Sequence, residues 1–141
     1  MKKQNFLTIT FIFLVVFVFT NCDQKAAQSS YDIFNLNENV EIKIGKKAKL
    51  NGGDLVVEFS DVTEDSRCPE NVNCIQAGQV TAKLMANDKS LSLTKEGKQK
   101  GGISGKVGDY SIEMIEVNPY PKDGIKTTKE DYSITLNVTK S

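Results

Sequence analysis

The stretch YSITLNV, residues 132–138, carries the clearest structural pattern in this chain. Its four apolar side chains alternate one by one with the polar side chains of Ser133, Thr135 and Asn137. A period of two residues places alternate side chains on opposite faces of a β-strand, whereas a helix would repeat every 3.6 residues. The stretch therefore predicts a strand with one buried face and one solvent-exposed face.

The same alternation recurs upstream, interrupted by turn signals. It is found in the segments 40–50, 55–62, 80–94 and 110–117. Within the third of these, the turn residues Asn87-Asp88-Lys89 divide the pattern and predict a hairpin. In the fourth, the apolar positions change phase at Ile115, which predicts a β-bulge or a bend.

These strands predict an all-β fold in one domain. About six to seven strands in about 100 residues, each with one buried face, are typical of a single antiparallel β-sandwich or small barrel. We assign residues 40–141 to this β-domain. The segment 97–108 holds five of the ten glycines. It lacks the helix that follows a phosphate-binding loop, so we expect a long, mobile hairpin loop there.

The first 21 residues have the layout of an export signal. Lys2 and Lys3 precede an apolar run at residues 6–19, which is shorter than the roughly 20 residues that a membrane-spanning helix needs. Residues 1–21 with the following Cys22 resemble a bacterial lipoprotein signal, in which the cysteine is acylated and the chain is cut just before it. The predicted location is the bacterial cell envelope, with the protein lipid-anchored to a membrane that faces the periplasm or the cell exterior.

Residues 22–39 are predicted to form a polar tether between the lipidated cysteine and the domain. Apolar residues at positions 31–36 interrupt this polarity, which allows the second half of the tether to pack on the domain. Phe19 and Asn21 depart from the residues usual before a lipidated cysteine. An uncleaved N-terminal anchor with an incidental Cys22 is the alternative.

The charge balance restricts the class of partner. The chain has 18 basic and 18 acidic residues, and removing Lys2 and Lys3 with the signal leaves a formal charge of −2. A nucleic-acid-binding protein would show a strong basic bias, so we do not expect nucleic acid as a partner. The expected partners are the membrane, through the lipid, and an envelope protein or polymer of unknown identity.

Two cysteines lie in the stretch DSRCPENVNC, residues 65–74. With Cys22 assigned to lipid, Cys68 and Cys74 remain as a pair outside the cytoplasm, where an oxidising environment favours a disulfide. A redox pair would more typically be separated by two residues, and a zinc site would need further ligands in a chain without histidine. We therefore predict a disulfide whose seven-residue loop contributes roughly 2 kcal/mol, with no metal and no cofactor.

The remaining side chains of this stretch allow a structural role or a recognition role. Arg67 can form a planar fork with a carboxylate such as Asp65 or Glu64. Rigid loops on a β-scaffold are also common places for recognition. The residues of the possible recognition loop are Glu64, Asp65, Arg67, Glu70, Asn71 and Asn73.

The preferred function is a binding or structural module without catalytic activity, and two alternatives stay open. A cation site would use the carboxylates of Asp61, Glu64, Asp65 and Glu70 with carbonyl oxygens of Asn71 or Asn73, although the spacing of calcium loops is absent. A hydrolase of envelope polymers would have to rely on carboxylates, lysine or tyrosine for acid–base chemistry, because the chain has no histidine. Glu113 and Glu116 are the paired acids considered for that role.

Three stretches carry a family resemblance: DSRCPENVNCIQAG at 65–78, YSIEMIEVNPYP at 110–121 and DYSITLNV at 131–138. They resemble a family of small bacterial lipoproteins and secreted β-domains with an Asp-Ser-Arg-Cys-Pro…Cys…Ala-Gly motif, a Pro-Tyr-Pro turn and a closing strand. The resemblance covers about residues 54–138, and Gln76 stands where the family often has tryptophan. It implies the architecture and the location, and it implies no activity.

Overall fold

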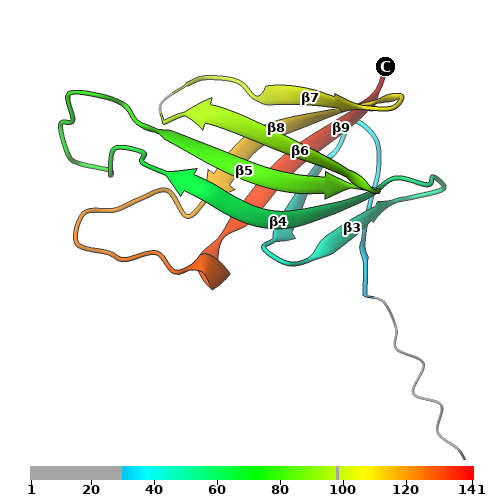
Figure 1. Cartoon of the computed structure of the whole chain (residues 1–141), viewed down its shortest axis with the longest axis horizontal. Helices are drawn as coiled ribbons and strands as arrows, with labels where there is room; N and C mark the ends of the chain where they lie inside the picture. Colours follow the sequence, from blue (N-terminus) through cyan, green and yellow to red (C-terminus); the bar gives the residue numbers. More distant parts are fainter. Residues whose placement is uncertain (1–29, 98) are drawn as a thin grey trace, which may run out of the picture.

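Nine strands and one short 3-10 helix make up the regular structure of residues 30–97 and 99–141 in this computed structural model (Figure 1). Two sheets pack face to face without closing into a barrel, so the predicted β-sandwich is confirmed, with more strands than expected. The elements are β1 (Asp32–Phe34), β2 (Asn39–Lys43), β3 (Lys47–Leu50), β4 (Val56–Asp65), β5 (Gln79–Ala86), β6 (Lys89–Glu96), β7 (Ile103–Val107), β8 (Tyr110–Asn118), η1 (Lys129–Asp131) and β9 (Ser133–Lys140).

The two sheets share one core. Sheet A has the strand order β1-β3-β4-β5-β6, and sheet B has the order β2-β9-β8-β7. Neighbouring strands are antiparallel except for the parallel pair of β1 and β3. The apolar stripes face the space between the sheets, and burying each large aliphatic side chain there contributes about 1.5–3 kcal/mol. The largest fully buried side chains include Ile42, Phe59, Leu84, Ile112, Met114, Ile134 and Leu136.

Two local predictions are confirmed. The hairpin of β5 and β6 pairs Ala86 with Lys89, and Asn87 in its turn has the left-handed φ of 51° that tight hairpin turns require. The register of β8 against β9 shifts between Met114 and Glu116, which places the predicted bulge at Ile115. Because the bulge adds one residue to β8, the side chain of Val117, the next buried residue, points into the core again.

The alternation at residues 40–50 belongs to two strands in different sheets. β2 pairs with β9 in sheet B, whereas β3 pairs with β4 in sheet A. Between them, Gly45 has a φ of 72° and donates its N–H to the carbonyl of Phe59 at 2.7 Å. Glycine adopts this left-handed conformation at little cost, so the chain can turn here from one sheet to the other. Both strands bury their apolar side chains in the same core, so the alternation in the sequence gives no sign that the chain changes sheets at this corner.

The prediction of a long loop at 97–108 is wrong, because residues 103–107 form the edge strand β7. The inward positions of β7 are Ile103, Gly105 and Val107. A Cβ atom on Gly105 would lie 2.6 Å from Cδ1 of Leu91 in β6, so the leucine fills the space that a side chain would occupy. Because this inward position holds glycine and not an apolar residue, the sequence of β7 does not show the alternation that predicts a strand.

The sheet also begins before the expected domain boundary at residue 40. β1 lies in the segment expected to be tether, and Phe34 at its end is only 4% exposed. Of the apolar residues of that segment, Phe34 and Leu36 therefore pack on the domain, whereas Tyr31 and Ile33 are exposed. Along the described ranges, no helix is long and apolar enough to cross a membrane. The expected signal at 1–21 and the lipidation at Cys22 lie outside the described residues.

Candidate functional site

Three connections meet at one end of the sandwich, on the left of Figure 1. They join β4 to β5 (residues 66–78), β6 to β7 (97–102) and β8 to β9 (119–132). We call this part of the molecule the loop end. Backbone hydrogen bonds link the three connections: the N–H of Gly97 donates to Gly78 at 2.9 Å, and the N–H of Glu70 donates to Pro121 at 2.9 Å.

The first connection is closed by the predicted disulfide. Cys68 and Cys74 are bonded with their Cα atoms 5.9 Å apart, and Cys68 is buried whereas Cys74 is exposed. Inside the ring, the N–H of Val72 donates to the carbonyl of Pro69 at 3.3 Å and closes a turn. Asn71 in this turn has a φ of 66°, a left-handed conformation that asparagine adopts more readily than most residues.

Arg67 forms the predicted fork, and its partner is Asp65. The Nε and Nη2 atoms of Arg67 donate to Oδ1 and Oδ2 of Asp65 at 2.8 and 2.7 Å. Only 3% of the arginine side chain and 9% of the aspartate side chain are exposed. The pair is therefore a buried, bidentate ion pair rather than a surface one.

The same arginine ties the two sheets together. Arg67 follows β4 of sheet A, yet its Nη1 donates to the carbonyl of Val117 in β8 of sheet B at 2.7 Å. Its Nη2 also donates to the carbonyl of Pro119 at 3.0 Å, and its guanidinium carbon lies 4.9 Å from the ring centroid of Tyr120. Four side-chain hydrogen bonds thus engage all three nitrogen atoms of the buried guanidinium.

Tyr132 completes this network from the start of β9. Its hydroxyl donates to Oδ2 of Asp65 at 2.9 Å. Burial alone would raise the pKa of Asp65, but the hydrogen bonds and charge of Arg67, with the Tyr132 hydroxyl, outweigh it and lower that pKa below the ordinary 3.8. Burial and the hydrogen bond to the Asp65 carboxylate raise the pKa of Tyr132 to about 12. The network therefore holds the carboxylate ionised and the phenol neutral.

This network predicts an acid-sensitive contribution to stability. Asp65→Asn leaves Arg67 without its anionic partner and should lower the free energy of unfolding near neutral pH by about 3 kcal/mol. Because the pKa of Asp65 is lower in the folded protein than in the unfolded chain, its contribution is full above the unfolded pKa of about 3.9 and is lost as the pH falls through the folded pKa. Urea unfolding of both proteins should show a difference that shrinks with acidification. The exposed Asp88→Asn is the control, and a difference independent of pH contradicts the account.

The structure divides the six candidate recognition residues into two groups. Asp65 and Arg67 are buried in the ion pair, which gives them the structural role that the sequence left open beside a recognition role. Their charges are neutralised by each other inside the sandwich, which leaves no free group for a ligand. The exposed candidates are Glu64, Glu70, Asn71 and Asn73.

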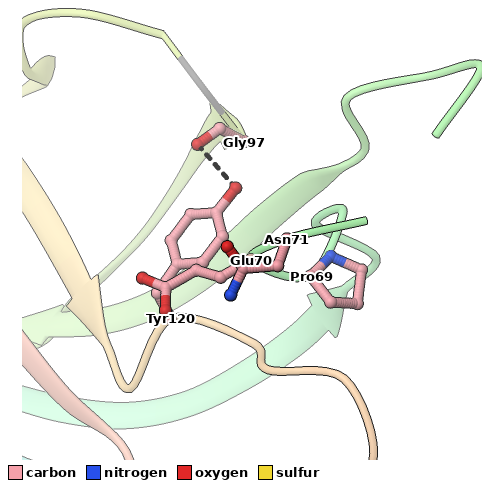
Figure 2. A pocket seen from close by; sticks show the side chains of 5 residues that line it. All are labelled: Pro69, Glu70, Asn71, Gly97 and Tyr120. Carbon is pink, nitrogen blue, oxygen red and sulfur yellow. Dashed lines mark hydrogen bonds between the residues drawn. The ribbon is translucent and has the colours of Figure 1, made fainter. Parts of the chain in front are cut away.

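A depression of about 370 Å³ lies at the loop end. It is lined by Pro69, Glu70, Asn71, Gly97 and Tyr120, which come from all three connections (Figure 2). Of the exposed candidates, Glu70 and Asn71 line it. Gly97 and Tyr120 were not among the six residues of the possible recognition loop, although an aromatic residue between two prolines is a sequence signal that can single out the latter.

The carboxylates considered for a cation site are held apart. Within the described ranges, no three cysteine, aspartate or glutamate side chains converge as a metal site would need. Each carboxylate has its own partner: Asp61 with Lys129 at 2.8 Å, Glu64 with Gln79 at 2.9 Å, Asp65 with Arg67, and Glu70 with Lys122 at 4.0 Å. The structure thus does not bring these four groups together.

The paired acids considered for a hydrolase flank the bulge in β8. Glu113 lies opposite Asn137 and Glu116 lies opposite Thr135 in β9. Glu116 borders a second depression of about 310 Å³ at the loop end, and Glu113 is not among the residues that line it. The two carboxylates therefore do not line one common site.

The glycine of the Ala-Gly pair that ends the cysteine motif is required for a steric reason. Gly78 has a φ of 66°, and a Cβ atom there would collide with the carbonyl oxygen of Ser66. Ser66 is held this close because its N–H and hydroxyl both bond the carbonyl of Gln79. Glycine is therefore required for the two ends of the connection to approach each other.

A matched pair of variants tests this requirement. Gly52 has nearly the same φ, 67°, but a Cβ atom there would meet nothing within 4 Å. Gly52→Ala should cost about 1 kcal/mol for the left-handed backbone alone. Gly78→Ala should cost at least about 2 kcal/mol more, or prevent folding, because the methyl group collides with backbone. Equal losses in urea unfolding would contradict the close approach at Gly78.

Comparison of the chain with protein-family models, with curated proteins and with solved structures gives no match. The fold and the site are those of a disulfide-closed β-sandwich with a shallow depression, lined by polar and aromatic side chains and built from three linked connections.

Proposed function

We propose that this protein is a cell-envelope lipoprotein that acts by binding, with the loop end as its recognition surface. The observation that carries the proposal is the fixed arrangement of the three connections by one disulfide, one buried ion pair and several backbone hydrogen bonds. A surface that is ordered before binding loses less conformational entropy when a ligand arrives. Exposed Glu70 and Asn71 beside Tyr120 then supply polar and aromatic contacts on a rigid support.

The anchoring part of the proposal is supported by the sequence. The basic Lys2 and Lys3, the apolar run at 6–19 and Cys22 together are typical of a lipoprotein signal. Each acyl methylene buried in a bilayer contributes roughly 0.8 kcal/mol, so more than one acyl chain would hold the protein firmly. The first described residues and β1 lie away from the loop end (Figure 1), which leaves the loop end free to face a partner.

Acylation at Cys22 is tested by Cys22→Ser. The variant should lose its acyl chains and move from the membrane fraction to the soluble fraction after carbonate washing, because the serine cannot carry the thioether-linked lipid. Fractionation with immunoblotting measures the shift, and Cys74→Ser serves as a control that should stay with the membrane. A Cys22→Ser protein that remains bound to the membrane would favour an uncleaved N-terminal anchor.

The recognition surface is tested by removing its exposed groups together. Alanine at Glu64, Glu70 and Asn73 should cost within about 0.5 kcal/mol of stability each, the usual range for surface residues. A photo-crosslinker placed at Asn71 in growing cells should yield a specific product that these three alanines abolish. The same crosslinker at Asp88, an exposed residue of the turn at the other end, should not yield it.

A matched set of three exposed residues controls for loss of surface charge and polarity. Alanine at Lys83, Asp88 and Ser90, all on the β5–β6 hairpin, should leave the Asn71 product unchanged. Identical products from both ends of the sandwich, or none from Asn71, would place recognition elsewhere.

A further inference from the structure

We infer that the depression at Tyr120 binds a saccharide, with a sugar ring stacked on the tyrosine and its hydroxyl groups bonded by Glu70 and Asn71. This inference rests on the proposed binding function and names the ligand class. A pyranose ring has C–H groups on its faces and hydroxyl groups around its rim. It therefore fits an aromatic face bordered by hydrogen-bonding side chains, and the volume of about 370 Å³ is in the range of small-molecule sites.

The aromatic face is held in a fixed position. The Tyr120 hydroxyl donates to the carbonyl of Gly97 at 3.3 Å, as Figure 2 shows, and prolines precede and follow the residue. The guanidinium of Arg67 lies 4.9 Å from the ring centroid. Arg67 borders the second depression and not the first, so the tyrosine separates the arginine from the proposed sugar site. The hydrogen bond to Gly97 and the contact with Arg67 thus fix the Tyr120 side chain before a ligand binds.

The hydrogen-bonding rim is equally fixed. Glu70 and Asn71 lie inside the Pro69–Val72 turn, and the disulfide closes the loop that contains it. Glu70 also forms a parallel bridge with Lys122, which joins the turn to the segment that carries Tyr120. The Glu70 carboxylate accepts hydrogen bonds from hydroxyl groups, while the Asn71 amide both donates and accepts hydrogen bonds. Hydroxyl groups, which themselves donate and accept, match this set.

The same residues disfavour other ligand classes. No lysine or arginine is among the five lining residues, and Lys122 at the border already faces Glu70, so a phosphate or another anion would find no unpaired cationic group in the lining. One carboxylate is too few for a hard divalent cation, which takes six or more oxygens. An ammonium group is disfavoured because Tyr120 already interacts with Arg67, and Glu70 already faces the Nζ atom of Lys122 at 4.0 Å.

The second depression indicates a ligand longer than one sugar. It shares Gly97 and Tyr120 with the first and measures about 310 Å³. Its lining includes the polar side chains of Lys95, Glu96 and Glu116, which can bond further hydroxyl groups. Two neighbouring depressions on either side of one tyrosine suit consecutive units of an oligosaccharide, as found in envelope polymers.

The inference is tested by titrating the detergent-solubilised, full-length protein with cellohexaose, chitohexaose and maltohexaose, and following its amide NMR signals. At concentrations up to about 10 mM, where a site with a millimolar Kd is largely filled, at least one should shift the amides of Glu70, Asn71 and Gly97. Tyr120→Leu should weaken that binding about tenfold and Tyr120→Phe by less than about threefold. Tyr110→Leu, at the opposite end, should leave it unchanged.

Asn71→Gly provides a variant that keeps the fold, since glycine accepts the left-handed backbone, and it should weaken binding about fivefold. Tetramethylammonium is the competing ligand class. Shifts of the same amides by tetramethylammonium and by none of the three oligosaccharides overturn the saccharide inference, as does the absence of any shift. Neither outcome affects the crosslinking product expected from Asn71, so the saccharide inference can fail while the proposed binding function holds. Binding that survives Tyr120→Leu overturns the stacking role.

Discussion

The loop end depends on the burial of one guanidinium group, that of Arg67. A buried cation is costly unless its nitrogen atoms find hydrogen-bond partners. Here the partners are Asp65 in sheet A, the carbonyl of Val117 in β8 of sheet B and the carbonyl of Pro119 just beyond it. Satisfying this one group therefore requires the two sheets and two of the three connections to adopt a single relative position. We regard the ion pair as a source of structural specificity more than of net stability.

The site follows from this constraint. Arg67 positions Tyr120 by contact with its ring, and the disulfide between Cys68 and Cys74 holds the turn that faces it. The backbone bond from Glu70 to Pro121 then sets the width of the depression. Each of these contacts is internal to the protein, so the depression exists before any ligand arrives. Preformed sites of this kind suit binding, because the ligand does not have to order them.

Sequence reasoning found the strands whose inward positions are all apolar, because a period of two is a direct consequence of strand geometry. It missed β7, since Gly105 stands at an inward position filled by Leu91, and it did not detect the corner at Gly45. In the site it found the disulfide and the Arg67 fork, which join neighbours in the sequence. It did not place Tyr120 beside Arg67, because that contact depends on how two sheets pack, and no local pattern encodes the packing.

Amide hydrogen exchange in Arg67→Lys tests most directly whether this residue holds the loop end together. Lysine keeps the charge but cannot form the fork or reach the same carbonyls. The account predicts that the amides of Cys68, Glu70 and Gly97 lose protection by a factor of about ten or more, through local opening. The amides of Asn37 and Asn87, bonded to Val138 and Val56 at the opposite end, should keep theirs. Unchanged protection at the loop end, or an equal loss at both ends, would contradict it.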